Sequence, residues 1–424
     1  MSVVGSVMRD YVRALKNSTL NARAFVLFTF LMSLYIGIYN VIFNLYVIKL
    51  GYTEQFLGLI ISASMISTGL FAFPAAQCCD RMGSKMCLVT SGLLTAVTLY
   101  LLYTVTSMEL LLALSLLNGI FGAIPTVIGH PFLVENSSQE NRLHLFSINF
   151  GTIMAATIIG TSVGGYLPQL CQVLFGLQEI GVDAYRYTLM ISLAIAALSV
   201  VPLIFIKDRK KPCPVKSDMK AFVRKLAESK VVRQLVLISC LIGMGAGLIV
   251  PFFNVYFNKV LSATPGEIGI IFSIAQVSMV VGSTVVPYLA RRIGRVRMVA
   301  LTYLCSVPFL LLLALTSNLY LAGAAYVLRM LFMNMSSPVS NSFSMEIVDS
   351  DDMASVSSLT STGNYIAISI GSLIAGVMMS WGAYTMPYLT ACVFYVLASV
   401  LYFKFFHRHE GRAILRVQEV EVST

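Results

Sequence analysis

The amino-acid sequence repeats itself at a separation of about 211 residues, which divides the chain into two similar halves. The repeated elements are Phe43-Asn44-Leu45-Tyr46 with Phe253-Asn254-Val255-Tyr256, Arg81-Met82-Gly83 with Arg292-Ile293-Gly294, Glu135 with Glu346, and the pair Gly160 and Gly165 with Gly371 and Gly376. Because the repeated residues keep their order and spacing, each half should fold into the same arrangement of elements.

Both halves are strongly apolar. Hydrophobic residues make up 57% of the chain and charged residues only 11%, whereas roughly a quarter of the residues of soluble proteins are charged. A helix crosses a bilayer with about 20 apolar residues. Twelve stretches qualify: 24–48, 54–77, 85–105, 109–133, 143–167, 186–206, 234–258, 265–288, 297–316, 319–344, 355–379 and 384–406. We therefore predict an all-α membrane protein of twelve transmembrane helices in two pseudo-symmetric six-helix halves, which is the plan of many carriers.

The basic residues predict which ends of the spans face the cytoplasm. Twelve spans with both termini inside place 25 of the 29 Lys and Arg residues on the inner side, where such residues are retained. Only Lys49, Arg186 and Lys259 fall outside, and Arg329 lies within a span. We expect an integral protein of the cell (plasma or inner) membrane with both termini cytoplasmic. The net charge of +10 then indicates contact with anionic membrane lipids and requires no nucleic acid.

The predicted domains are a six-helix bundle over 1–206, a basic cytoplasmic linker over 207–233, and a second bundle with a short cytoplasmic tail over 234–424. In the linker, the segment from Met219 to Leu226 fits either an amphipathic helix on the inner leaflet or a solvated basic stretch. The longest outer loop, 168–185, is too short to hold an enzyme core. No nucleotide-binding loop or metal-like Cys or His spacing occurs, so we expect neither enzymatic activity nor a cofactor or metal.

One predicted inner loop carries a family signature. It reads Ala76-Gln77-Cys78-Cys79-Asp80-Arg81-Met82-Gly83-Ser84-Lys85-Met86-Cys87-Leu88. This resembles the loop motif of the major facilitator superfamily, Gly-x-x-x-Asp-Arg-x-Gly-Arg-Lys followed by an apolar residue, with Ala76 and Ser84 departing from the pattern. A weaker copy recurs around Arg292 and Gly294, where Arg291 replaces the acid. The resemblance implies transport by alternating access between inward-open and outward-open states.

Charged side chains in these loops are candidates for a gate, because a carboxylate at a helix end can accept hydrogen bonds that break when the halves separate. The alternative is a basic loop that only sets topology. The predicted gating residues are Asp80, Arg81, Gly83, Lys85, Glu135, Arg292, Gly294 and Glu346. Several prolines and glycines offer places where gating helices can bend. These are Pro125, Pro131, Pro251 and Pro338, with Gly243, Gly245 and Gly247.

The fifth span contains Gly160-Thr161-Ser162-Val163-Gly164-Gly165. This is similar to the Gly-Pro-x-x-Gly-Gly motif of the drug/proton antiporter branch of the superfamily, with Thr161 in the place of proline. Small residues at this spacing also allow two helices to pack closely. The segment therefore suggests membership of the antiporter branch and fits plain helix packing as well.

Arg329 lies near the middle of the tenth span, and Asn118 is its repeat mate in the fourth. A charge at that depth is costly unless it faces water or a partner. Arg329 could bind an anionic group of a substrate, respond to a proton elsewhere, or be satisfied structurally by carbonyls and by Asn334. No Asp or Glu lies in the middle third of any span, so His130 is the candidate for proton coupling, with a packed structural histidine as the alternative.

The resemblance also places spans one, four, seven and ten around a central cavity. Their polar residues, together with one from span eight, form the candidate substrate site: Tyr35, Tyr39, Asn40, Asn44, Asn118, Asn254, Tyr256, Gln276 and Arg329. Amides and phenols can bind a polar or amphipathic solute, and they can equally bond helix to helix.

The favoured function is proton-coupled export of an amphipathic organic compound by a secondary carrier that works as a monomer. The alternatives are uptake or exchange of a small organic anion or sugar-like solute, a lipid or lysophospholipid flippase, and a receptor without transport.

Overall fold

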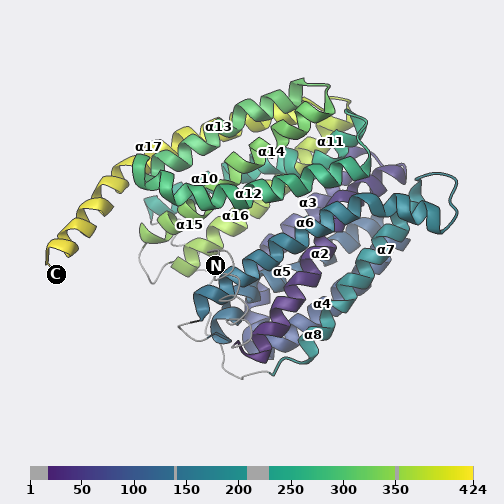
Figure 1. Ribbon diagram of the computed structural model, residues 1–424, viewed down its shortest axis with the longest axis horizontal. Coiled ribbons are helices and arrows are strands. Elements are labelled where there is room, and N and C mark those ends of the chain that lie inside the picture. The colour runs from purple at the N-terminus through teal and green to yellow at the C-terminus, as the bar shows by residue number, and fades with distance from the viewer. Residues whose placement is uncertain (1–17, 138–140, 208–228, 349–352, 424) are drawn as a thin grey trace, which may run out of the picture. The chain divides into compact units, whose positions relative to one another are not determined.

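A computed structural model describes residues 18–137, 141–207, 229–348 and 353–423, and within these ranges the ordered elements are helices (Figure 1). The elements of the first half are α2 (Leu20–Lys49), α3 (Glu54–Met82), α4 (Ser84–Thr104), α5 (Met108–Glu135), α6 (Arg142–Leu174), α7 (Val182–Leu198) and α8 (Val200–Ile204). Those of the second half are α10 (Lys230–Ile249), η1 (Val250–Phe252), α11 (Phe253–Lys259), α12 (Pro265–Ile293), α13 (Arg295–Leu315), α14 (Leu319–Met335), α15 (Ser337–Glu346), α16 (Met353–Ser380) and α17 (Met386–Ser423).

Within the described residues, 11 helical stretches are long and apolar enough to cross a membrane. The remaining predicted span, 319–344, is divided into α14 and α15 at Ser336. Pro338 lies in the first turn of α15, where its missing N–H is tolerated. The chain is therefore an integral membrane protein.

Two predicted boundaries were wrong at the end of the fifth span. The sequence predicted a loop from residue 168, but α6 continues through Pro168 to Leu174, and α7 begins at Val182. The segment from Met219 to Leu226 and most of the predicted linker lie outside the described residues.

The seventh span bends where the sequence placed a proline. Between α10 and α11 the backbone forms a 3₁₀ turn, η1, that contains Pro251. Proline cannot donate to the preceding turn and its ring clashes with the carbonyl four residues earlier, so the α-helical pattern changes there. By contrast, α5 contains both Pro125 and Pro131 and remains one continuous helix.

The described helices form two compact units. Of the described residues, unit 1 comprises 18–52, 63–137, 141–207 and 264–273, and unit 2 comprises 53–62, 229–263, 274–348 and 353–423. Each unit consists mainly of one half of the sequence. The exceptions are the first turns of α3, which group with unit 2, and those of α12, which group with unit 1.

The repeat is visible in one close helix contact of each unit. In unit 1, a Cβ built on Gly160 of α6 would lie 2.4 Å from the carbonyl oxygen of Leu34 in α2. In unit 2, a Cβ on Gly371 of α16 would lie 2.6 Å from the carbonyl oxygen of Met244 in α10. Side chains do not fit at these distances, so glycine allows α2 to touch α6 and α10 to touch α16.

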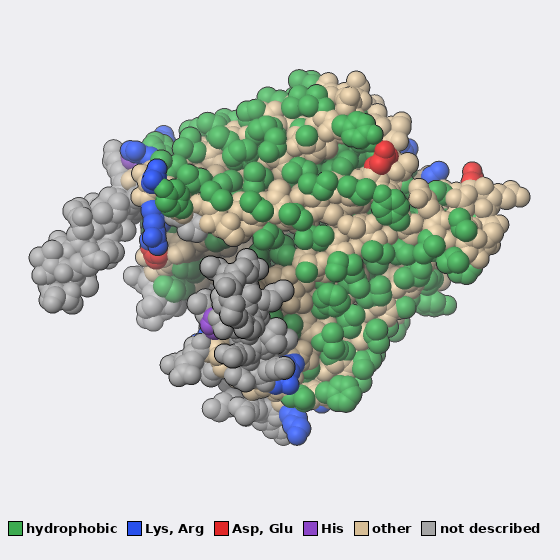
Figure 2. Space-filling model, in the orientation of Figure 1, with side chains coloured by type: hydrophobic (Ala, Val, Ile, Leu, Met, Phe, Trp, Pro, Cys, Tyr) green, Lys and Arg blue, Asp and Glu red, His purple; other side chains and the backbone are tan. Residues whose placement is uncertain are grey.

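Large apolar side chains cover the flanks of the helices, as Figure 2 shows for one face of the molecule. On α17, Val393, Val396, Val400 and Phe403 follow the spacing of one helical face and are exposed. In water such a surface would aggregate, whereas in a bilayer it contacts lipid tails. The exposed stripes of the helices are therefore the lipid-facing surface.

Candidate functional site: a buried arginine in an aromatic cluster

Arg329 is the one charged side chain of α14, and it is only 2% exposed. Its Nη2 donates a 2.6 Å hydrogen bond to the hydroxyl of Tyr395 on α17, and its Nη1 lies 3.0 Å from the sulfur of Met330. The guanidinium also lies against two rings, with its Cζ 5.4 Å from the centre of Phe253 and 5.5 Å from that of Tyr395. The cation is thus held by π faces and a phenol.

No carboxylate within the described parts of the chain forms an ion pair with Arg329. Its Nε is buried and has no hydrogen-bond partner among the described residues. An arginine stays protonated in proteins, and an unpaired buried donor costs about 1–3 kcal/mol or more when it is charged. The arrangement therefore keeps a positive charge and a free donor available inside unit 2.

An aromatic cluster surrounds this cation. Phe253 of α11 contacts Tyr326 edge-on at 4.6 Å and Tyr388 of α17 at 5.9 Å between ring centres, and Tyr388 contacts Tyr256 at 4.5 Å. The hydroxyl of Tyr388 is buried and, like Arg329 Nε, lacks a hydrogen-bond partner in the part of the chain that the structure describes. Arg329 Nε and the Tyr388 hydroxyl are thus two buried donors in one aromatic cluster that have no acceptor among the described residues. Strain, a catalytic role, or a bound water or ion accounts for such groups in native proteins.

Tyr388 and Tyr395 were not among the predicted site residues, because the family pattern does not place the twelfth span around the cavity. One signal was present: Tyr388, Tyr395 and Tyr402 recur every seven residues, which puts them on one face of α17. All three are buried. Gly245 of α10 makes room for the second of them, since a Cβ there would lie 2.6 Å from the ring of Tyr395.

The other predicted site residues of unit 2 are used differently. Tyr256 donates hydrogen bonds to the carbonyl oxygens of Leu313 and Ala314 at 3.2 and 3.4 Å, at the end of α13. Asn254 is 1% exposed and its side-chain oxygen accepts from the N–H of Val255. Gln276 on α12 is half-buried. Of these three, Tyr256 and Asn254 have visible structural roles.

In unit 1, the predicted site residues of α2 form a row of rings beside two amides. Tyr35 lies 6.1 Å from Tyr39, which stacks on Phe43 at 4.5 Å. Asn40 is exposed and Asn44 half-buried on the same helix. Asn118 on α5, the repeat mate of Arg329, is also half-buried. This set offers apolar faces and neutral polar groups.

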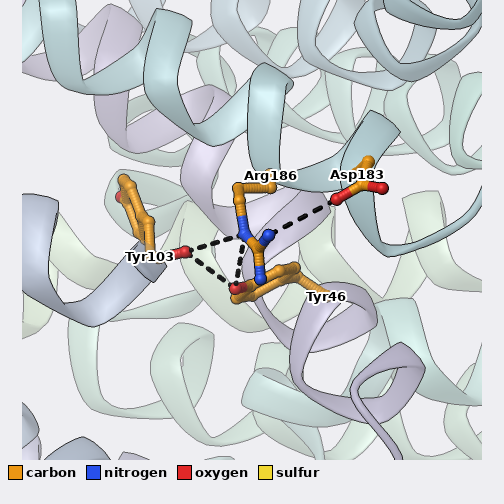
Figure 3. Close-up of polar contacts among 4 residues, drawn as sticks. All are labelled: Tyr46, Tyr103, Asp183 and Arg186. Atoms are coloured by element: carbon orange, nitrogen blue, oxygen red, sulfur yellow. Dashed lines mark hydrogen bonds and ion pairs between the residues drawn. The ribbon is translucent and has the colours of Figure 1, made fainter. Parts of the chain in front are cut away.

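A polar cluster at the predicted outer end of unit 1 was not foreseen. Figure 3 shows Arg186 of α7 between Tyr46 of α2 and the end of α4, where its Nε approaches the Tyr46 hydroxyl at 3.4 Å and the carbonyl oxygen of Tyr103 at 3.2 Å. Tyr46 donates to the same carbonyl at 2.8 Å, and Asp183 lies 3.4 Å from Arg186 Nη1. The cluster ties three helix ends together.

The contact of Tyr46 repeats in the second half. Tyr46 and Tyr256 end the repeated four-residue segments, and each caps a carbonyl at an equivalent position, in Tyr103 and Leu313. The last carbonyls of a helix lack partners within the helix. The repeat therefore preserves a helix cap, and this was the signal in the sequence for both tyrosines.

A second unforeseen cluster lies at the predicted outer end of unit 2. Tyr384 donates a 2.6 Å hydrogen bond to Glu54, and Lys259 lies 3.6 Å from the same carboxylate oxygen. The Glu54 side chain is only 10% exposed. Burial and the neighbouring carboxylate raise the pKa of Tyr384 above its ordinary value. The cluster joins the start of α3 to α11 and to the turn before α17.

Each motif loop turns at a glycine with the same backbone. Gly83 has φ 87° and ψ 151°, and Gly294 has φ 91° and ψ 148°. Only glycine adopts these angles readily. Lys85 donates to the carbonyl oxygen of Ile204 at 2.7 Å, so it caps α8.

The remaining predicted gating residues have varied surroundings. The Cζ of Arg292 lies 4.7 Å from the ring centre of Tyr288. Glu346 Oε2 forms an ion pair with Arg295 Nη1 at 2.5 Å, and both side chains are exposed to solvent. Arg81 and Glu135 are exposed. The side chain of Asp80 lies outside the described residues. His130, the candidate for proton coupling, is exposed and stacks on Phe146 at 5.8 Å.

The small and hydroxyl residues of the fifth span pack closely within unit 1. The hydroxyls of Thr161 and Ser162 lie 2.7 and 2.6 Å from that of Ser273 on α12. A Cβ on Gly165 would lie 2.4 Å from the carbonyl oxygen of Pro265. Helix packing is sufficient to account for this segment. In unit 2, the hydroxyls of Ser62 and Ser369 make the matching contact between α3 and α16.

Comparison with known families decides the identity of the fold. The sequence pattern of the family described as Major Facilitator Superfamily matches residues 25–235 and again residues 235–419. The chain belongs to the major facilitator superfamily. The predicted family and its fold of two six-helix halves are thereby confirmed. Members of this superfamily are transporters, so a small-molecule substrate and a lipid environment follow.

Individual similarities are more distant. The chain is 25% identical over 269 residues to the multi-drug resistance efflux pump PmrA of Streptococcus pneumoniae, which covers 62% of this chain and 63% of that protein. The match thus spans less than two thirds of the length of that relative.

Two solved structures share the fold. The nucleoside transporter NupG superimposes with a TM-score of 0.73 at 15% identity over 91% of this chain and 99% of its own. A bacterial homologue of the human lysosomal transporter Spinster, in an inward-facing and unoccupied conformation, gives 0.73 at 15% identity over 90% and 95%. These two likenesses concern the fold alone.

Proposed function

We propose that this member of the superfamily exports an amphipathic organic compound across the cell membrane by alternating access, in exchange for protons. The observation that carries the proposal is the similarity to the efflux pump PmrA. The interior chemistry supports it. Rings line α2 and α11 while neutral amides supply polar contacts, which suits solutes with an apolar body and a polar end.

His130 is the proposed proton-coupling residue. It lies on α5 beside Pro131, and histidine side chains serve as proton shuttles in proteins. The spans hold no acidic residue in their middle third, which leaves few other groups for this role. Both termini are proposed to be cytoplasmic, and one chain, with both halves of the carrier, is proposed to work as a monomer.

The second candidate is uptake or exchange of a small organic anion, and the burial of Arg329 without a paired carboxylate favours it. Direction of transport separates the two. An exporter in exchange for protons moves its solute out of an alkaline compartment toward an acidic one.

The test uses purified protein in liposomes with an imposed pH gradient and a panel of fluorescent amphipathic compounds of positive, zero and negative charge. We expect flux that depends on the gradient and that loses this dependence in His130→Gln. His144→Gln, a substitution at another exposed histidine, is the matched control. Absence of flux for every compound would contradict the proposed function. Flux that is unaltered by the gradient would remove the proton coupling.

A further inference from the structure

In unit 2, two buried donors for which the described residues offer no acceptor belong to side chains that contact the same aromatic ring. They are Nε of Arg329 and the hydroxyl of Tyr388. Phe253 contacts both side chains, with its ring 5.4 Å from the guanidinium carbon and 5.9 Å from the Tyr388 ring. Arg329 is 2% exposed and Tyr388 is fully buried. The described residues supply no acceptor to either donor, whereas buried polar groups in proteins are as a rule hydrogen-bonded.

The surroundings of the other two guanidinium nitrogens indicate what kind of acceptor would fit. Nη2 is used by Tyr395 and Nη1 faces the sulfur of Met330. Hydroxyl and thioether groups are neutral, so they leave the positive charge uncompensated in a low-dielectric interior. A neutral acceptor would satisfy Nε but not the charge. A negative group satisfies both.

We propose that Arg329 Nε and the Tyr388 hydroxyl form a binding site for a single monovalent anionic group. The inference rests on the proposed function and specifies it: the solute is an amphipathic compound whose polar end is an anion such as a carboxylate. A free inorganic anion such as chloride has the same chemistry and is the other source that the experiment distinguishes. The aromatic side chains around the site would contact the apolar part of the solute next to its carboxylate.

The site belongs to the second half only. The repeat mate of Arg329 is Asn118, an uncharged and half-buried residue of unit 1. Of the two equivalent positions in the repeated halves, only one carries a positive charge, so each carrier should bind one anionic group. This asymmetry predicts a single anion for each chain.

The experiment measures binding to the purified full-length protein in an uncharged detergent and a sulfate buffer free of halides. Decanoate, decanamide, acetate and chloride are titrated separately by calorimetry, with thermal stability as a second readout. Decanamide is the uncharged match of decanoate. We expect decanoate to bind with one site per chain and about 10-fold more tightly than decanamide, because both can accept hydrogen bonds from the guanidinium but only the carboxylate also compensates its charge.

Variants assign the binding to the two donors. Tyr388→Phe removes only a hydroxyl that has no partner, so the protein should fold normally while its affinity for decanoate falls several-fold. Tyr402→Phe removes a phenol from the same face of α17, where that ring packs against Phe343 and Phe406, and should leave the affinity unchanged. Arg329→Lys keeps the charge without the Nε donor and should bind weakly, and Arg329→Gln should not bind.

The outcomes separate the sources of the anion. Tight binding of decanoate that chloride does not displace identifies the head of the solute. Binding of chloride at millimolar concentration that displaces decanoate identifies an inorganic anion. In either case the anion site stands. Equal affinity for decanoate and decanamide, together with no effect of chloride or of Tyr388→Phe, would overturn it. Gradient-dependent flux of neutral or cationic compounds in that situation would leave the proposed function standing without the anion site.

Discussion

Arg329 and Asn118 occupy equivalent positions in the two halves, yet only Arg329 is buried, at 2% exposure, and only Arg329 is charged. Elsewhere the halves agree closely. The glycine turns at Gly83 and Gly294 differ by only a few degrees in φ and ψ. Contacts that hold the bundle together have been kept in both halves, and the group at its centre has diverged. We therefore propose that the second half recognises the solute.

The strongest test of this difference between the halves is to replace Arg329 and Asn118 separately. Arg329→Gln removes a charge-assisted hydrogen bond of about 1.5–3 kcal/mol, so transport should fall by about 10–100-fold. Asn118→Ala removes a neutral group, and its expected effect is about fivefold or less. Initial rates of solute flux in liposomes give both values. Equal losses in the two variants would mean that the halves contribute alike.

The support beneath Arg329 gives a second test. Gly245 faces the ring of Tyr395, and a Cβ there would lie 2.6 Å from it. Gly245→Ala should displace that ring and the arginine bonded to it, and lower stability by about 1–3 kcal/mol, as overpacking does. Gly151→Ala on α6 meets open space, so it should be neutral or slightly stabilising. Thermal unfolding in detergent compares the two, and similar melting temperatures would contradict the tight fit.

The two tyrosine caps should differ by less. Tyr46 donates at 2.8 Å and also contacts Arg186, whereas the bonds of Tyr256 are 3.2 and 3.4 Å long. Tyr46→Phe should therefore cost about 1–1.5 kcal/mol and Tyr256→Phe about 0.5 kcal/mol. Melting temperatures of both variants against the unaltered protein are the measurement. A larger loss for Tyr256→Phe would reverse the ranking of the caps.

The smallest effect concerns the predicted outer ends. In unit 2 Lys259 and Tyr384 both contact Glu54. Lys259 and its repeat mate Lys49 are both exposed. Tyr384 must be neutral to donate, and its pKa is raised in the folded protein. A raised pKa means that the stabilisation is complete below the ordinary value of 10.0 and is lost as pH rises through the folded value.

The melting temperature, measured from neutral to strongly alkaline pH, tests whether stability falls as Tyr384 loses its proton. The unaltered protein should lose an increment of stability above about pH 10 that Tyr384→Phe lacks, while Tyr384→Phe is already less stable at neutral pH. Tyr320→Phe, at an exposed tyrosine of α14, is the control and should follow the unaltered protein. Parallel curves for all three would show that the bond to Glu54 does not contribute.

The fold could be predicted well because its main signals can be read along the chain. The lengths of the apolar stretches predict the membrane spans, and the internal repeat predicts two equivalent halves. Boundaries failed where helices continued through a tolerated proline, as α6 does at Pro168, or broke at a short turn, as at Ser336. Local rules for proline do not settle which outcome occurs, because neighbouring helices decide whether the altered backbone is supported.

The candidate site was only partly predictable. Arg329 could be recognised as a charge inside a span, but its partners come from α11 and α17, and sequence gives no distance between helices. Tyr388 and Tyr395 share one face of α17, a pattern that is equally typical of lipid-facing or packed rings. Glu54, Lys259 and Tyr384 are far apart in the chain and meet only through folding.

The most direct test of the account is solute exchange in liposomes loaded with a labelled amphipathic carboxylate, with its uncharged amide as the comparison. We expect the unaltered protein and Tyr402→Phe to exchange the carboxylate faster than the amide, and Arg329→Gln to exchange the carboxylate about 10–100-fold more slowly than the unaltered protein. Equal exchange of carboxylate and amide, undiminished in Arg329→Gln, would contradict the claim that the buried arginine of the second half recognises the solute.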